Sequence, residues 1–308
     1  MTFHERALAL GYAASYANPL RSIRVSKEHR RAEALPEAEE IAVVLAFDTE
    51  YTPPWVAGTW ERNGEDVQAS KGLHNVLALT KELGAAGTFL VEGVFARENP
   101  RLVESVVVGE HEVGYHGFSH ESYGGFWRTN TGQQPRVLAR EDVLGYISRG
   151  KELIQDMVGK APTSFVAPFH HMRKSTLTAL GQLGFTADSS VYNHVYGLGD
   201  PFEISLGGST IVEIPFGVAF PVNRLGFSPF FPTVLEAYRM DEERTIGSVT
   251  RVVRRGSRSR HLLLTCHPWE FFDPESVQSS SLRSLLTRLV ETGRVNWKTM
   301  SEVAADYH

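Results

Sequence analysis

IAVVLAFDTE (residues 41–50) joins seven consecutive apolar residues to a short polar cluster that holds two carboxylates. A short run that is apolar at every position is typical of a strand buried on both faces in a parallel sheet. Acidic groups directly after such a strand stand where α/β sheets and barrels place their active sites. This stretch therefore indicates the fold class and marks one candidate for the functional site.

The alternation of strands and helices continues along the chain and predicts an α/β fold. Further strands are expected at 85–93, 111–117, 163–169, 186–192, 209–216 and 261–269. Helices are expected at 72–85, 100–108, 138–158, 174–185 and 281–293, the third ending at Gly159. About seven such units favour a (β/α) barrel, including an incomplete one.

Composition limits the kinds of binding partner and the cellular compartment that we expect for this protein. The 308-residue chain has a formal net charge of -5, so bulk electrostatics give no reason to expect nucleic acid or anionic lipid. Its one cysteine, Cys266, cannot form an intrachain disulfide and suits a reducing compartment. The first residues lack the pattern of a secretion signal, and no run of about 18 apolar residues occurs. We therefore expect a cytoplasmic protein without a transmembrane segment.

Two carboxylates and two imidazoles follow separate strands. In FDTE (47–50), Asp48 and Glu50 share a strand face, where two negative charges are costly unless a cation or a donor lies between them. In HGFSH (116–120), the glycine and serine favour a sharp turn that presents His116 and His120 to one point. Such a set suits a catalytic divalent metal. A helix N-cap with a surface acid, and two surface histidines, are the alternatives.

The third cluster is HPWE (267–270), which follows the last strong strand. A histidine at this place suits a general acid or base, because its pKa lies near neutrality. A histidine packed against backbone is the alternative interpretation of His267. Cys266 and His267 point to opposite faces of a strand, so Cys266 is interpreted as a small core residue and not as a nucleophile.

Other chemistries lack support. Neither G-x-S-x-G nor G-x-x-x-x-G-K-[ST] occurs, so a serine-hydrolase elbow and a phosphate loop are not indicated. We interpret the basic run RVVRRGSRSR (251–260) as a solvated helix end in preference to an anion site.

In this order and spacing, the clusters resemble the polysaccharide deacetylase family, also called the NodB-homology or carbohydrate esterase family 4 fold, over about residues 41–308. FDTE resembles the first motif in its D-x-E form. EVGYHGFSHES resembles the metal-binding histidine motif, SFVAPFHH the third motif, ADSSVY the next segment and LLLTCHPWEF the last motif. The variant form is similar to peptidoglycan-deacetylase-like and allantoinase-like branches.

The resemblance implies a distorted (β/α) barrel, often with seven strands, and a set of roles. Asp48 matches the general base, His267 the general acid, and Glu50, His116 and His120 the ligands of a divalent metal, which we take as zinc. The metal would lower the pKa of the attacking water and polarise the acyl oxygen. The implied substrate is an amino sugar or glycan precursor with an N-acyl, most simply N-acetyl, group.

Two departures from the family pattern bear on the site. The arginine of the third motif, which holds the base aspartate, is absent; Val166 stands near its place, and His170 or His171 could replace it. Gly117 stands where a serine or threonine is usual. Residues expected to touch substrate or to support the metal ligands are His170, His171, Asp188, Trp269, Glu270, Phe230 and Phe231.

We expect residues 1–40 to form a helical extension and residues 41–308 the catalytic barrel. The stretch 190–240 is expected to form irregular substrate loops. Within it, VNRLGFSPFFP (222–232) should line the cleft by stacking on sugar rings, unless it forms a homo-oligomer interface. Two other functions stay open: hydrolysis of a non-sugar amide, ureide or cyclic imide, and a catalytically inactive carbohydrate-binding relative.

Overall fold

The structure, a computed structural model, describes residues 40–53, 66–124, 137–190, 201–215 and 261–307, with a few positions between 243 and 253. Three expectations fall outside these residues. They concern positions 1–39 of the expected extension, the aromatic stretch 222–232 with Phe230 and Phe231, and nearly all of the basic run 251–260.

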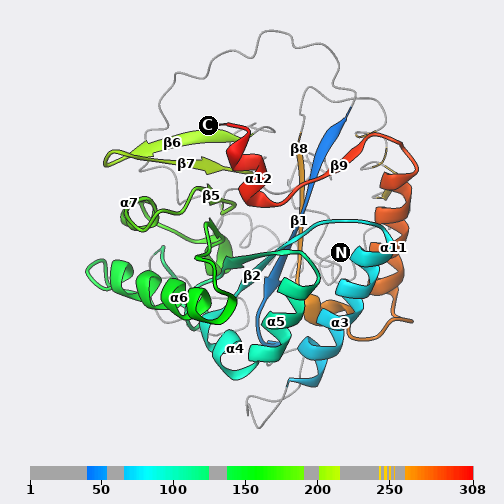
Figure 1. The fold of residues 1–308 in the computed structure, drawn as a ribbon, viewed down its shortest axis with the longest axis horizontal. Coiled ribbons are helices and arrows are strands. Elements are labelled where there is room, and N and C mark those ends of the chain that lie inside the picture. Colours follow the sequence, from blue (N-terminus) through cyan, green and yellow to red (C-terminus); the bar gives the residue numbers. More distant parts are fainter. Residues whose placement is uncertain are drawn as a thin grey trace, which may run out of the picture.

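One sheet organises the described residues (Figure 1). Its parallel strands follow the order β7-β5-β4-β3-β2-β1-β8, with β6 antiparallel at the β7 edge and β9 beside the start of β1. The strands are β1 (Ile41–Thr49), β2 (Thr88–Val91), β3 (Glu112–Tyr115), β4 (Ser164–Phe165), β5 (Ala187–Asp188), β6 (Phe202–Leu206), β7 (Ser209–Glu213), β8 (His261–Cys266) and β9 (Val295–Trp297). No pairing joins β6 to β8 in the part of the chain that the structure describes, so the barrel is distorted and open there.

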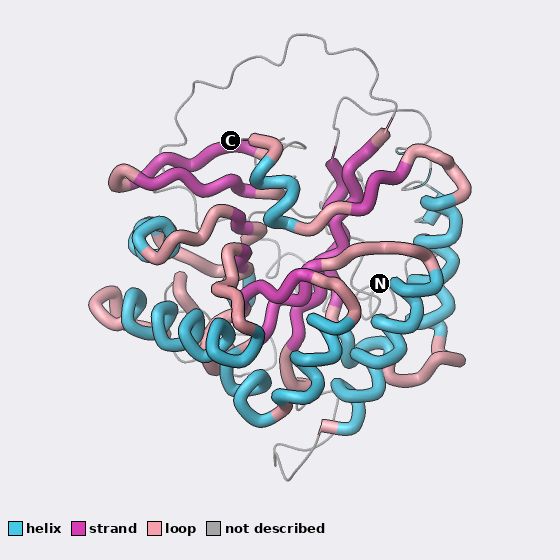
Figure 2. Tube along the Cα trace, in the orientation of Figure 1, coloured by secondary structure: helices cyan, strands magenta, loops and turns pink. Residues whose placement is uncertain are grey.

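Most helices lie on the outside of this sheet (Figure 2). They are α3 (Val67–Glu82), α4 (Gly93–Glu98), α5 (Pro100–Val108), α6 (Val143–Val158), α7 (Lys174–Gln182), α11 (Val277–Val290) and α12 (Met300–Ala305), with short 3₁₀ turns η2 (Pro168–His170) and η3 (Pro268–Phe271). Among the described residues, no helix is long and apolar enough to cross a membrane.

The two faces of the strands pack into different cores. On β1, Val43, Leu45 and Phe47 join the large core under the outer helices. Val44 and Ala46 point the other way, into a smaller core that α12 fills with Met300, Val303 and Ala304. Because side chains alternate along a strand, the residues two and four positions beyond Ala46 also face inward. The fold thus directs Asp48 and Glu50 into the mouth of the barrel.

The predicted alternation of strands and helices is confirmed, with local differences. The strand expected at 163–169 shrinks to Ser164–Phe165, because Pro168 opens the turn η2. Helix α6 ends at Gly159, whose φ of 74° only glycine adopts readily, as predicted. The expectation that 190–240 is irregular was wrong for β6, which forms a hairpin with β7 through Gly207 and Gly208, both at positive φ.

Truncating the inner core should destabilise the fold. Met300 is completely buried in the smaller core, so Met300→Ala leaves a cavity and should lower the free energy of unfolding by about 2–5 kcal/mol. Val108→Ala, on an exposed position of α5, serves as the control and should change it by less than about 0.5 kcal/mol. Urea unfolding curves measure both; equal midpoints would show that α12 does not support the sheet.

Candidate metal centre and active site

The first site residues stand at the end of β1. Asp48 and Glu50 are 2% and 8% exposed, and both lie on the inner face of the strand. Thr49 between them points away, and its hydroxyl donates to the Phe47 carbonyl at 2.9 Å. The alternation predicted from FDTE is therefore present, and it places two buried carboxylates side by side.

The histidines come from the segment after β3. Gly114 packs closely on Leu90 of the inner core, so His116, two residues later, enters the barrel on the same face. Gly117 then turns the chain at φ 79°, where a Cβ would meet Pro168 at 2.8 Å, and His120 itself adopts φ 56°. A positive φ at a non-glycine residue costs free energy and persists only where the surroundings enforce it.

Glu121 holds the turn between His116 and His120 in place. Its buried carboxylate accepts hydrogen bonds from the Phe118 amide at 3.0 Å, the Ser119 amide at 2.6 Å and the Tyr123 hydroxyl. These bonds close the turn on the residue that follows the second histidine. The sequence analysis missed Glu121, although an acid directly after H-x-x-x-H is visible in the sequence.

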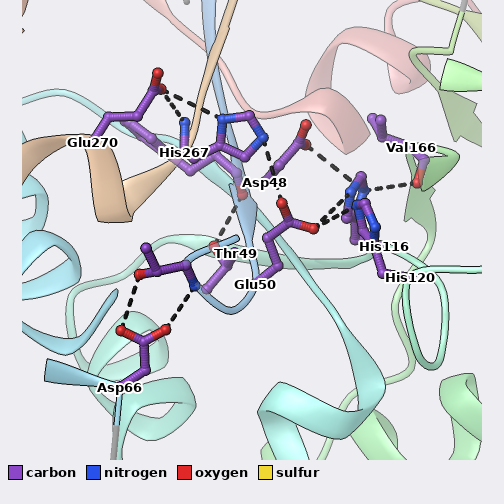
Figure 3. Close-up of polar contacts among 11 residues, drawn as sticks. Asp48, Thr49, Glu50, Asp66, His116, His120, Val166, His267 and Glu270 are labelled. Atoms are coloured by element: carbon purple, nitrogen blue, oxygen red, sulfur yellow. Dashed lines mark hydrogen bonds and ion pairs between the residues drawn. The ribbon is translucent and has the colours of Figure 1, made fainter. Parts of the chain in front are cut away.

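The carboxylate and the two imidazoles converge on one point (Figure 3). Glu50 Oε2 lies 2.7 Å from His120 Nε2 and 3.7 Å from His116 Nε2. One ligand atom from each of the three residues lies within 4.8 Å of the others, so the group could hold a metal ion. The sequence predicted this set, and the fold brings it together from β1 and from the turn after β3.

Details of the geometry fit a divalent cation. His116 Nδ1 lies 3.0 Å from the Val166 carbonyl, which can only accept, so this nitrogen carries the proton and Nε2 keeps its lone pair for a metal. Ligand atoms about 2.1 Å from a tetrahedral zinc lie roughly 3.4 Å apart, close to the 3.7 Å between Glu50 and His116, whereas Glu50 and His120, at 2.7 Å, are hydrogen-bonded directly and would have to separate. Asp48 Oδ1 is buried and has no hydrogen-bond partner among the described residues, so a cation held by the neighbouring Glu50 would balance its charge.

Electrostatics give His116 and Glu50 the protonation states that a metal requires, whereas His120 shares its proton with Glu50 and would release it when a metal binds. Burial lowers the pKa of His116 to about 3, so its ring is neutral. Burial alone would raise the pKa of Glu50, but the charge and hydrogen bond of His120 lower it overall. Conversely, burial lowers and Glu50 raises the pKa of His120, and the net shift is upward. Glu50 therefore remains a carboxylate, the form that binds metal.

His267 approaches the same point from β8. Leu263 belongs to the inner core, and His267, four residues on, faces the same way, with Nε2 3.6 Å from Glu50 Oε1. Glu270 accepts the His267 backbone N–H at 2.9 Å and lies 3.5 Å from its Nδ1, while Trp269 stacks on the ring at 4.8 Å. Burial opposes the charge on His267, but Glu270, Glu50 and Asp48 outweigh it and raise its pKa to about 9.

Asp48 lies between these groups. Its Oδ1 is 3.8 Å from His116 Nδ1, which is already committed to Val166, so this contact is no hydrogen bond. Burial raises the pKa of Asp48 to about 7, although the charge of His267 counteracts the effect. A cation held by Glu50 would lower it again and favour the carboxylate form.

The remaining predicted site residues have different surroundings. His170 is buried at φ 52°, with its amide donating to Ala167, and His171 Nδ1 lies 3.3 Å from the Ser122 hydroxyl. Asp188 is completely buried and accepts from the Ser190 hydroxyl at 2.8 Å. Trp269 and Glu270 contact His267, as described. Sequence reasoning gave Ser190 no role, although this residue lies in the quoted segment ADSSVY, and it missed Glu213, which stands in none of the quoted motifs.

The fold and the site together define a class of protein. It is an α/β protein with an open parallel barrel and a candidate metal centre at the ends of its strands. Residues 36–187 match the family model of polysaccharide deacetylase, which assigns this stretch to that family. The match covers β1 to β4 with the three candidate ligands, while His267 lies beyond it.

Known proteins agree with this assignment. The chain is 29% identical over 178 residues to a peptidoglycan deacetylase from Helicobacter pylori (strain ATCC 700392 / 26695), a match that spans 56% of each chain. Two solved structures share the fold. A Mycobacterium smegmatis protein assigned to the polysaccharide deacetylases has a TM-score of 0.63 at 22% identity, covering 88% of this chain and 91% of that one. The allantoinase Puue has a TM-score of 0.62 at 14% identity, covering 89% and 91%.

Neutralising Glu121 should loosen the histidine turn. Glu121→Gln replaces one accepting oxygen by an NH₂ group, so either the Phe118 amide or the Ser119 amide loses its acceptor, at a cost of about 1–3 kcal/mol. Amide hydrogen exchange should accelerate over residues 116–120. Glu152→Gln, which alters an exposed bond to Ser148 on α6, is the control. Unchanged exchange in the turn would refute this role.

Proposed function

We propose that the chain is a metal-dependent hydrolase that removes an N-acyl group, most simply acetyl, from an amino sugar or a glycan precursor. The observation that carries this proposal is the arrangement around Glu50. His116 and His120 lie on one side of its carboxylate, and His267 lies on the other, with Asp48 two residues away on the same strand face. Candidate ligands, base and acid thus share one buried point.

Glu50, His116 and His120 would hold the cation, which we take as zinc because two imidazoles and one carboxylate suit it. When bound, such a cation supplies Lewis acidity that makes water a stronger nucleophile at neutral pH and polarises an acyl carbonyl. Asp48, freed from competing hydrogen bonds at Oδ1, takes the proton of the attacking water.

His267 completes the reaction on the other side. Its raised pKa keeps the ring protonated near neutrality, so it can give a proton to the amine nitrogen as the C–N bond breaks. The water oxygen ends on the acyl carbon, and the products are a carboxylic acid and a free amine. Glu270 holds the ring through the backbone bond and the contact at Nδ1, which leaves Nε2 directed toward the site.

The substrate class rests on the peptidoglycan deacetylase relative and on the family, while the solved structures support the fold alone. Because we expect a cytoplasmic protein, the proposed substrate is a soluble or lipid-linked precursor and not a finished wall polymer. A panel of N-acetylated amino sugars, ureides and cyclic imides tests this choice. Turnover of a ureide alone would favour the non-sugar hydrolase, and bound metal without any turnover would favour an inactive relative.

The metal set can be tested directly. The purified protein should contain close to one zinc per chain, and His120→Ala should lose most of it, because two ligands hold zinc far more weakly than three. His74→Ala, on the exposed side of α3, is the matched control and should keep the wild-type content. Elemental analysis measures all three proteins, and full retention of metal in His120→Ala would exclude this triad.

The acid–base pair should be needed for turnover and not for metal binding. Asp48→Asn and His267→Ala should each lower kcat by at least about 100-fold with metal retained, the lower bound for positioned proton transfer. Cys266→Ala changes the neighbouring, outward-facing residue and should stay active. Near-native turnover of metal-loaded Asp48→Asn would move the base assignment to another group.

The pH dependence of the rate follows from the same pair. Asp48 must be ionised, so the rate rises as pH increases through its pKa, which is about 7 without the cation and lower with it. His267 must be protonated, so the rate falls as pH increases through its pKa, which is about 9 without the cation and lower with it. The profile should be a bell whose two limbs belong to the coupled site.

A further inference from the structure

The peptide unit between Val166 and Ala167 connects a candidate metal ligand to a buried acid. Its carbonyl accepts the Nδ1 proton of His116 at 3.0 Å. Its N–H donates to the Ser190 hydroxyl at 2.9 Å. Ser190 in turn donates to Asp188 Oδ1 at 2.8 Å. His116, both residues of the peptide unit, Ser190 and Asp188 are all at most 2% exposed, so water does not compete for these bonds.

This chain of hydrogen bonds from His116 to Asp188, called the relay below, ends at an acid that has a carboxyl partner of its own. Asp188 on β5 pairs in register with Glu213 on β7, and the two side chains are hydrogen-bonded. Two carboxyl groups can share a hydrogen bond only when a proton lies between them, so at least one of the two acids is protonated. The backbone amide of Ser189, the residue after Asp188, donates to the Phe165 carbonyl at 3.1 Å. Asp188 therefore has a fixed place in the fold.

In this relay the backbone between Val166 and Ala167, and not a side chain, supports the metal ligand His116. A metal-bound histidine usually donates its second N–H to a carboxylate or a carbonyl, which fixes the ring and its tautomer. A neutral carbonyl is the weaker partner of the two. Here the carbonyl belongs to a peptide whose N–H is bonded toward a carboxylate, and hydrogen bonds in a chain polarise one another.

We propose that Ser190 is a positioning residue for the metal centre, which acts with Asp188 through the 166–167 peptide to hold His116 with Nε2 toward the cation. The inference rests on the proposed metal triad. Its role is to orient and polarise a ligand, and neither Ser190 nor Asp188 touches the cation or the substrate.

A matched pair of serine variants separates positioning from simple packing. Ser190→Ala removes the hydroxyl of the relay. Ser164→Ala, on β4, removes another buried hydroxyl that also donates to a carboxylate, Glu112 at 2.6 Å, but it belongs to a different network. Both variants lose a hydrogen bond to an acid, and Ser190→Ala also leaves the buried Ala167 N–H without its acceptor, so Ser190→Ala should lower the free energy of unfolding more. Only the first should alter the metal centre.

The measurement is the zinc dissociation constant, obtained by competition with a chelator of known affinity, together with the unfolding midpoint of each metal-free protein. Ser190→Ala should bind zinc about 10-fold to 100-fold more weakly than the wild type, the range for supporting partners of metal ligands. Ser164→Ala should stay within about twofold. Asp188→Asn, which keeps the size of the side chain and removes the charge, should weaken zinc binding by a smaller factor and carries the test if Ser190→Ala does not fold.

Equal zinc affinity in the wild type, Ser190→Ala and Asp188→Asn would overturn the positioning role while leaving the triad intact. Equal losses in Ser190→Ala and Ser164→Ala would also overturn it, because the effect would then be general destabilisation. Absence of zinc binding in the wild type would instead overturn the proposed metal centre, and the positioning role with it.

Discussion

The structure depends on placing two carboxylates, Asp48 and Glu50, on the inner face of a buried strand. An isolated buried carboxylate is strongly disfavoured, and two on one face also repel each other. Among the residues that the structure describes, imidazoles that follow β3 and β8 offset this cost. Imidazoles can act as hydrogen-bond donors without a cation and as ligands with one, so the same residues suit both situations.

Two of these histidines receive opposite protonation states from their partners. His116 bonds to a carbonyl and is buried, which leaves it neutral and suited to metal ligation. His267 lies beside the Glu270 carboxylate, which together with Glu50 and Asp48 outweighs burial and keeps its ring charged. The partner at Nδ1 therefore distinguishes the roles of the two histidines. It is a backbone carbonyl oxygen for His116 and a carboxylate oxygen for His267.

Backbone strain is concentrated where the chain must present these groups. His120, Phe169 and His170 all adopt positive φ, and Phe169 packs edge-on against His120 with ring centroids 4.4 Å apart. Such conformations cost about 1–3 kcal/mol each and require compensation nearby. Glu121 closes the first turn, and the bonds around the 166–167 peptide fix the chain just before the second. The site is thus built from two opposed turns, each held by a buried carboxylate.

The sequence by itself determined the α/β class, most strands, and the convergence of Glu50, His116 and His120, because strand-end position and residue chemistry are local properties. It could not give the short helix α4, the hairpin strand β6 or the length of β4, where tertiary packing outweighs weak local preference. It also missed Glu121 and the Ser190–Asp188–Glu213 connection. Only the tertiary structure decided these, because hydrogen bonds between β4, β5 and β7 depend on which strands become neighbours, and no spacing along the chain encodes that order.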